Sequence, residues 1–271
     1  MFNRVVCTGP IVAKLRELDA DVICLQEVDV HDDPIAQVSV DVAREIARAL
    51  GLCGVWAGHH AYEDRGIWGC AVLTKLSMAP ATPCFLELEH FEFYPRGAVM
   101  VELQCPAVTK HRSGDDRIRV ISMHTEVCCA PEVRAAQLAK VCAHTFVADA
   151  GDIPTLIAGD MNTLGGHRIL RLSPIHHLVH PPWEKRMLDG WLTRPHPKTE
   201  AAWWRDEVLP SSAPGFTPTR EASPANRESG VLTATLGFSW PISVVEKLDW
   251  VLLRGLKHAG DSGEQVGTGN E

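Results

Sequence analysis

The chain has 271 residues, of which 45% are hydrophobic, and this is enough apolar material for the core of one large α/β domain. Its formal net charge of −8 argues against strong, sequence-independent binding to duplex DNA, because such binding depends on many Lys and Arg contacts with phosphates. No apolar run approaches the roughly 18 residues that a membrane span needs.

The cysteines point to a reducing compartment. All 9 are scattered along the chain without a C-x-x-C pair, and several lie inside apolar runs, as reduced core thiols do. The N-terminus also carries no basic region followed by a long apolar segment. We therefore predict a cytoplasmic protein that does not span a membrane, and we expect it to be a monomer.

Helical spacing and short apolar runs alternate along most of the sequence. Pro10 suits the first turn of a helix, and Gly51 suits the end of one. In chain order, the patterns predict a helix at 11–18, a strand at 20–27, a helix at 41–50, strands at 69–74, 98–103 and 118–123, a helix at 131–147, and strands at 154–160 and 244–253. This alternation predicts an α/β fold.

We predict a single domain over residues 1–254. Within it, residues 174–243 form a loop-rich insertion, since the part up to 226 is rich in Pro, Trp, His and Ser and shows no clean period. Residues 255–271 contain many glycines and little apolar content, so we expect a flexible tail.

The most informative stretch is Gly159-Asp160-Met161-Asn162, which follows a buried-strand pattern. It places a carboxylate and a carboxamide at a strand end, where α/β proteins carry chemistry. Glu27 ends the run at 20–27 in the same way. Carboxylate and amide oxygens suit Mg²⁺ or Mn²⁺, so we predict that these acids hold one divalent cation. The alternatives are a simple turn at Asp160 and Asn162, and a solvated residue after a strand at Glu27.

His124 and Asp249 are further candidates for the site. His124 ends the strand at 118–123, where it could donate a proton or a hydrogen bond to a phosphoryl oxygen; it could equally be a structural histidine. Asp249 lies in an otherwise apolar strand and is costly to bury unless it has a partner. It could orient a catalytic histidine or pin a loop, and spacing does not separate the two roles.

Several other segments have two possible interpretations, one functional and one structural. Arg134 and Gln137 share one helix face, which supports either a role beside the site or an ordinary solvated face. Asn3 is a candidate metal or water ligand, or an ordinary polar residue near the N-terminus. The segment Thr199–Arg205 contains two adjacent tryptophans and forms either a lid over the substrate or a short amphipathic helix that packs them.

Taken together and in this order, these segments resemble the endonuclease/exonuclease/phosphatase (DNase I-like) superfamily. The resemblance covers residues 11–254. Its blocks are Asp21–Glu27, Gly69–Lys75, Ser122-Met123-His124-Thr125 with the helix that follows, Gly159–Asn162 and Lys247–Trp250. The fold that it implies is a four-layer αββα sandwich, with two mixed β-sheets face to face and helices outside.

The resemblance also implies a reaction and a role for each site residue. Glu27 would bind Mg²⁺, His124 would contact the scissile phosphate, and Asp160 with Asn162 would position or activate the attacking water. Asp249 would orient a final histidine. The implied activity is metal-dependent hydrolysis of a phosphoester, by a nuclease, phosphodiesterase or phosphatase, through in-line attack of water on phosphorus.

Two departures from the family pattern leave a second hypothesis open. The family closes with a Ser-Asp-His segment after the Asp249 block, which this sequence lacks, and its first-strand Asn normally lies further from the N-terminus than Asn3 does. We therefore weigh an active hydrolase against a catalytically impaired member that serves as a binding module. The two differ in whether metal-dependent turnover occurs.

Overall fold

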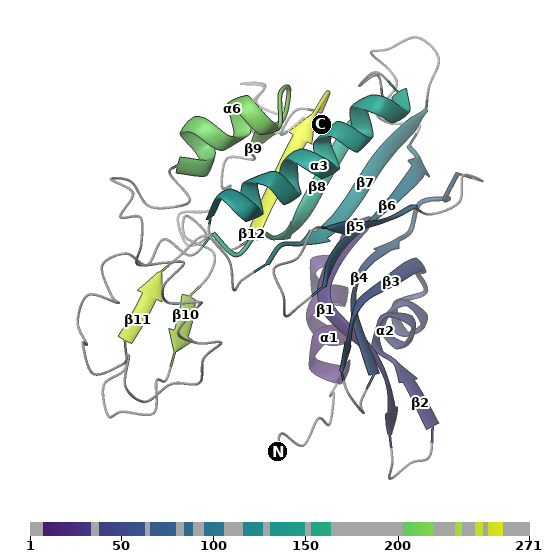
Figure 1. Ribbon diagram of the computed structural model, residues 1–271. Coiled ribbons are helices and arrows are strands. Elements are labelled where there is room, and N and C mark those ends of the chain that lie inside the picture. The colour runs from purple at the N-terminus through teal and green to yellow at the C-terminus, as the bar shows by residue number, and fades with distance from the viewer. Residues whose placement is uncertain are drawn as a thin grey trace, which may run out of the picture.

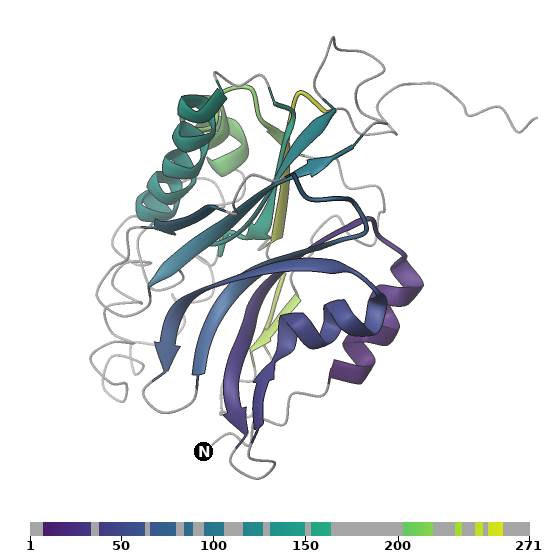
Figure 2. The same ribbon diagram turned by 90° about the vertical axis from the view of Figure 1, so that its right-hand side faces the viewer.

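The computed structural model describes residues 8–33, 38–62, 66–79, 84–88, 95–105, 116–126, 131–149, 153–163, 203–218, 231–234, 242–245 and 249–256. Two sheets lie face to face, and helices cover the outer face of each (Figure 1; Figure 2). The predicted α/β four-layer sandwich is therefore confirmed.

The first sheet has the strand order β2-β1-β4-β3. Its strands are β1 (Val22–Asp33), β2 (Val38–Asp41), β3 (Cys53–Tyr62) and β4 (Gly66–Thr74). Apolar side chains alternate between its two faces, as the period of a strand requires. Ile23 and Leu73 face the outer helices, whereas Cys70 and Val72 face the second sheet.

The second sheet has the order β5-β6-β7-β8-β12-β9. Its strands are β5 (Cys84–Leu88), β6 (Arg96–Gln104), β7 (Arg117–His124), β8 (Thr155–Asp160), β9 (Thr217–Pro218) and β12 (Asp249–Arg254). The strands β7 and β8 are parallel and are joined through helix α3 (Pro131–Asp149). A separate pair of short strands is formed by β10 (Val231–Ala234) and β11 (Ile242–Val245).

We expected both sheets to be mixed, and only the second one is. Every described strand pair of the first sheet is antiparallel. Parallel neighbours need a crossover connection, and helix α3 supplies one between β7 and β8. Helix α2 (Val42–Leu50) instead connects β2 to β3, which lie at opposite edges of the first sheet.

Helices α1 (Thr8–Leu18) and α2 cover the outer face of the first sheet (Figure 2). The side chain of Asp41 caps α2 by accepting a hydrogen bond from the Arg44 N–H at 2.9 Å. Gly51 ends this helix with a φ of 68°, a left-handed conformation that glycine adopts without a steric cost. The boundaries predicted for this helix are thus confirmed, with their physical cause.

The outer face of the second sheet is covered by α3, the π-helix η4 (Trp204–Val208) and α6 (Leu209–Ser212). Trp204 is fully buried there, and its ring centroid lies 5.9 Å from that of Trp250 on β12. Of the two readings of the Thr199–Arg205 segment, the packed helix is therefore the correct one for Trp204.

Two strand predictions needed correction, and β3 was not predicted at all. The run at 20–27 continues to Asp33, so Glu27 does not end its strand. The run at 244–253 is not one strand, because β11 ends at Val245 and β12 begins at Asp249. The sequence also gave no sign of β3, since its two glycines and adjacent histidines interrupt the alternation of apolar residues. Most of the predicted insertion and nearly all of the predicted tail lie outside the described residues.

Candidate active site

Three of the predicted site residues meet at one edge of the second sheet. His124 ends β7, Asp160 ends β8 and Asp249 begins β12. The strand register pairs His124 with Asp160 and Asp160 with Asp249. Nε2 of His124 lies 3.9 Å from Oδ2 of Asp160. The histidine is buried, while Asp160 keeps 24% of its side chain exposed and Asp249 is exposed, so the two acids reach solvent.

Asn162 belongs to the same cluster through its backbone and its side chain. Its N–H donates to Oδ1 of Asp160 at 2.8 Å, and its Nδ2 donates to the carbonyl of Thr125 at 2.9 Å. Its φ of 47° lies in the left-handed region, which asparagine tolerates better than most residues. The turn at Asp160 and Asn162 thus exists, and it is the device that fixes the Asp160 carboxylate beside His124.

Arg96, the first residue of β6, is a site residue that the sequence analysis missed. Its Nη1 lies 3.2 Å from Nδ1 of His124, and its Nε lies 3.7 Å from Oε2 of Glu126. Only 4% of Arg96 and none of Glu126 is exposed. A lone arginine before an alternating strand gives no signal of this role, because a solvated strand end looks the same in sequence.

The contact with Arg96 fixes the protonation of His124. A guanidinium can only donate, so Nδ1 of His124 accepts and the ring proton lies on Nε2, on the side of Asp160. Burial first, and then the charges of Arg96 and His59, hold the pKa of His124 well below its ordinary value. The imidazole is therefore a neutral hydrogen-bond donor that points toward the carboxylate edge.

The ring of His59, on β3, packs against the ring of His124. The two ring centroids are 6.1 Å apart in an edge-to-face arrangement. Nδ1 of His59 lies 2.9 Å from the carbonyl of Pro95, and Nε2 lies 3.8 Å from the Cys70 thiol. Burial lowers the pKa of His59 to about 4, so this imidazole is uncharged at neutral pH. It belongs to the first sheet, which therefore also shapes the surroundings of His124.

Arg134 and Gln137 are buried rather than solvated, so the solvated-face reading of this pair is wrong. Oε1 of Gln137 accepts from the N–H of Glu126 at 2.9 Å, and Nη1 of Arg134 donates to the carbonyl of Glu126 at 3.3 Å. Helix α3 thereby holds the segment that follows His124. The positive charge of Arg134 also acts to lower the pKa of Asp160.

The two acids at the edge disfavour each other's ionised forms. Burial raises the pKa of Asp160, against the opposing effects of the Asn162 N–H and of two arginines. Burial and the negative charge of Asp160 raise the pKa of Asp249 to about 6. Neighbouring carboxylates with raised pKa values gain stability when a cation lies between or beside them. The chemistry of this oxygen-rich pair therefore fits a hard divalent ion.

Glu27 belongs to the first sheet and lies within strand β1. Gln26 and Glu27 together face one residue of β4, which makes a β-bulge, and the φ of Glu27 is 57°. Ser122 holds the bulge against β7, because its Oγ accepts from the Gln26 side chain at 2.9 Å and donates to the Leu25 carbonyl at 3.0 Å. Ser122 precedes His124 by two residues, or about 7 Å of strand.

The predicted metal ligands are only partly described. Asn3 lies outside the described residues. Within the described part of the chain, no group of three or more His, Cys, Asp or Glu side chains is arranged to hold a metal ion. Mg²⁺ often binds proteins through one or two carboxylates and keeps several waters, so the exposed Glu27 carboxylate still suits this ion.

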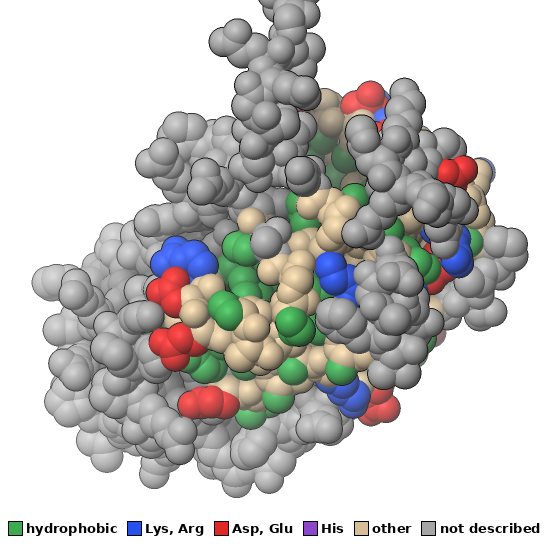
Figure 3. Space-filling view, turned by 90° about the horizontal axis from the view of Figure 1, so that it is seen from above, with side chains coloured by type: hydrophobic (Ala, Val, Ile, Leu, Met, Phe, Trp, Pro, Cys, Tyr) green, Lys and Arg blue, Asp and Glu red, His purple; other side chains and the backbone are tan. Residues whose placement is uncertain are grey.

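One face of the molecule, seen from above, carries mixed charge. The described acidic and basic side chains on it are interspersed around an uncharged and apolar middle, and do not gather in one basic patch (Figure 3). This agrees with the net charge of −8. Within the described residues, no helix is both long and apolar enough to cross a membrane.

Comparison with known proteins gives a family match over most of the chain. Residues 8–258 match the model of the Endonuclease/Exonuclease/phosphatase family. No curated protein matches the chain by sequence. The match includes all five sequence blocks on which the resemblance to this family rests, from Asp21–Glu27 to Lys247–Trp250.

Solved structures with this architecture share little sequence with the chain. An endonuclease/exonuclease/phosphatase from Beutenbergia cavernae has a TM-score of 0.57 at 18% identity, and the alignment covers 93% of this chain and 59% of that one. The human Nocturnin catalytic domain with bound sulfate has a TM-score of 0.52 at 16% identity, covering 90% and 72%. ANGEL2, a 2',3'-cyclic phosphatase, in complex with adenosine-2',3'-vanadate has a TM-score of 0.53 at 16% identity, covering 91% and 74%. At these identities the likeness concerns the fold.

Proposed function

Because the chain belongs to the endonuclease/exonuclease/phosphatase family, we propose that it is a metal-dependent phosphoester hydrolase in which water attacks phosphorus in line. The family is named for enzymes that cleave phosphoester bonds. One observation carries the proposal for this chain, namely the row of His124, Asp160 and Asp249 on adjacent strand ends. A neutral imidazole donor beside two solvent-accessible carboxylates is the chemistry that this reaction needs.

In this proposal His124, Asp160 and Asn162 each have a separate role. The Nε2–H of His124 donates to a phosphoryl oxygen, since Arg96 occupies the opposite ring nitrogen. Asp160 orients the attacking water and accepts its proton, which its raised pKa favours. The side chain of Asn162 is tied to the Thr125 carbonyl and keeps this turn rigid.

Mg²⁺ or Mn²⁺ is the cofactor that the donor set suits. Glu27 would hold the ion, together with Asn3, and water would complete its coordination. When bound, such an ion neutralises the negative charge that develops on the phosphoryl oxygens. When ionised, Asp249 adds negative charge beside Asp160, and this charge favours the binding of a cation there.

The test is turnover of bis-p-nitrophenyl phosphate and of p-nitrophenyl phosphate, with Mg²⁺ or with EDTA. We expect chelator-sensitive hydrolysis of at least one ester. Asp160→Asn and His124→Ala should each lower it by about 10² or more. Asp116 is an exposed aspartate directly before β7, so Asp116→Asn is the matched control for the loss of one carboxylate.

The outcome also separates an active hydrolase from a binding module. Metal-dependent turnover that both site variants abolish supports the enzyme. Folded protein that turns over neither ester in any metal, while still binding them, contradicts the proposal and favours the binding module.

A further inference from the structure

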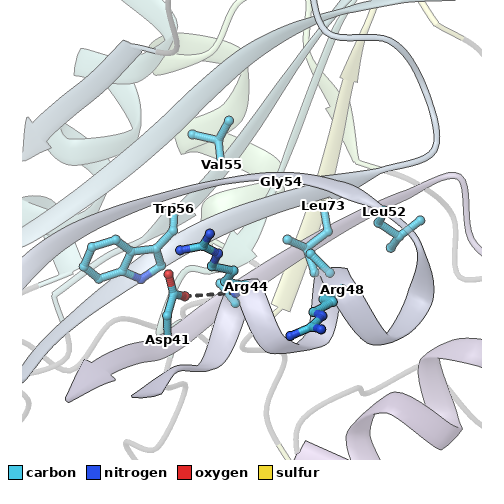
Figure 4. A pocket seen from close by; sticks show the side chains of 10 residues that line it. Asp41, Arg44, Arg48, Leu52, Gly54, Val55, Trp56 and Leu73 are labelled. Carbon is cyan, nitrogen blue, oxygen red and sulfur yellow. Dashed lines mark hydrogen bonds between the residues drawn. The ribbon is translucent and has the colours of Figure 1, made fainter. Parts of the chain in front are cut away.

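A pocket on the outer face of the first sheet is separate from the candidate active site. It lies between helix α2 and the edge strand β3 and has a volume of about 380 Å³ (Figure 4). This size falls within the range of pockets that bind small molecules. The His124 edge belongs to the other sheet, so the two sites face different directions.

A glycine of β3 allows an apolar side chain to form the floor of this pocket. Gly54 and Trp56 occupy alternate positions of β3, Leu52 lies directly before this strand, and all three line the pocket. A Cβ at Gly54 would lie 2.6 Å from Leu73 and 3.6 Å from Ala47. Gly54 therefore leaves room for the Leu73 side chain, which forms an apolar floor of the pocket together with Ala47.

Two arginines line the helix side of this apolar gap. Arg44 and Arg48 are one turn apart on α2, and both are exposed. Among the described residues, neither forms an ion pair, although Arg117 and Arg119 elsewhere in the chain pair with Glu102. Guanidinium groups bind phosphate oxygens through two parallel hydrogen bonds, so this pair suits a phosphate.

An aromatic ring and a carboxylate lie at the end of the pocket next to Arg44. The indole of Trp56 is held in place by its hydrogen bond to the Val28 carbonyl at 3.0 Å. In Figure 4 the guanidinium of Arg44 and the carboxylate of Asp41 both lie beside this ring. A flat base can stack on the indole, while Asp41 can accept from sugar hydroxyls or from an amino group of the base.

We propose that this pocket binds a nucleoside monophosphate. The base stacks on Trp56, the phosphate binds Arg44 and Arg48, and the ribose lies over the apolar floor of Leu73 and Ala47. The proposal does not depend on the hydrolase activity, since none of these residues belongs to the His124 edge. It assigns the chain a second ligand site, on the face of the first sheet that the helices only partly cover.

The experiment is isothermal titration calorimetry in EDTA with adenosine 5'-monophosphate, adenosine and inorganic phosphate as separate probes. We expect saturable binding of adenosine 5'-monophosphate to one site, tighter than that of either fragment. The double variant R44A/R48A should weaken it at least about tenfold. Trp56→Leu should also weaken it about tenfold, whereas Trp56→Phe keeps the stacking surface.

Two controls separate this site from the rest of the molecule. Arg16→Ala removes the same charge from the neighbouring helix α1, outside the pocket, and should leave binding unchanged. Asp160→Asn should also leave it unchanged. The proposal is overturned if wild-type protein shows no saturable binding. It is equally overturned if R44A/R48A binds as well as wild type, or if only Asp160→Asn alters the affinity.

Discussion

Arg96 donates to Nδ1 of His124 at 3.2 Å, and through this contact a residue at the start of β6 sets the tautomer of a histidine at the end of β7. The antiparallel register of the two strands, which pairs Gly97 with His124, makes the contact possible. Arg96 also contacts Glu126, so a buried cation is shared between the candidate catalytic histidine and a buried carboxylate.

The variant Arg96→Met should raise the pKa of His124, because it removes the positive charge that disfavours the imidazolium ion. It should also destabilise the fold by about 3 kcal/mol, since Glu126 loses an ion pair in the interior. Histidine NMR titration measures the first effect and urea denaturation the second. The double variant R96M/E126Q is the control. It should recover much of the lost free energy of unfolding, whereas the pKa of His124 should stay raised. An unchanged His124 titration in both variants would contradict the assignment.

Asp249→Asn should change how stability depends on pH. Burial and the Asp160 charge raise the pKa of Asp249 to about 6 in the folded protein, against about 3.9 in an unfolded chain. Between these values the folded state binds the proton more tightly, so the free energy of unfolding of the wild type falls as the pH rises from about 4 to 6. The variant lacks this fall and should gain stability relative to wild type as the pH increases.

The measurement is urea denaturation at several pH values between 4 and 7.5, in EDTA so that no cation neutralises the pair. Asp116→Asn serves as the control for an exposed aspartate distant from Asp160. Parallel stability profiles for wild type and Asp249→Asn would show that the two carboxylates do not interact.

The sequence was sufficient to predict that His124 and Asp160 lie at strand ends, although not that Glu27 lies inside its strand or that Asp249 begins one. His124 and Asp160 each terminate an apolar run, and neighbouring strands then place them side by side. Arg96 could not be found this way, because its role depends on the pairing of β6 with β7, which local patterns do not encode. Glu27 was predicted at a strand end, yet β1 continues to Asp33, and Val28, Asp29 and Val30 pair with β4 beyond the bulge.

The polar residues beyond Glu27 show why this continuation was missed. Asp29 is buried and His31 is nearly so, with Nδ1 of His31 3.1 Å from Oδ2 of Asp29. Adjacent acids and histidines usually indicate a loop, whereas here the two side chains lie next to each other on one face of a strand.

Trp204 should contribute to stability and not to substrate access. It is fully buried against Trp250 behind the second sheet, so Trp204→Ala should lower the free energy of unfolding by about 3 to 5 kcal/mol. Trp203→Ala, at the partly buried neighbour, is the matched comparison and should cost less. Thermal denaturation measures both. If instead Trp204→Ala left stability intact and changed only the KM for a phosphoester, the residue would be part of a lid.

The left-handed backbone of Glu27 leads to a prediction in which two variants differ only in conformational freedom. Glu27→Ala and Glu27→Gly both remove the carboxylate, and both should weaken Mg²⁺ binding measured by calorimetry. In an ordinary strand, Gly is less stable than Ala by roughly 0.5–1 kcal/mol. At a φ of 57° the order should reverse, because a left-handed conformation costs a residue with a Cβ roughly 1–2 kcal/mol. We therefore expect Glu27→Gly to be about 1 kcal/mol more stable than Glu27→Ala in urea denaturation.

The usual order, with Ala more stable, would mean that the bulge does not hold Glu27 in this conformation. A bulge that keeps a glutamate in a left-handed conformation, although glycine is more stable there, is what a function for that carboxylate predicts.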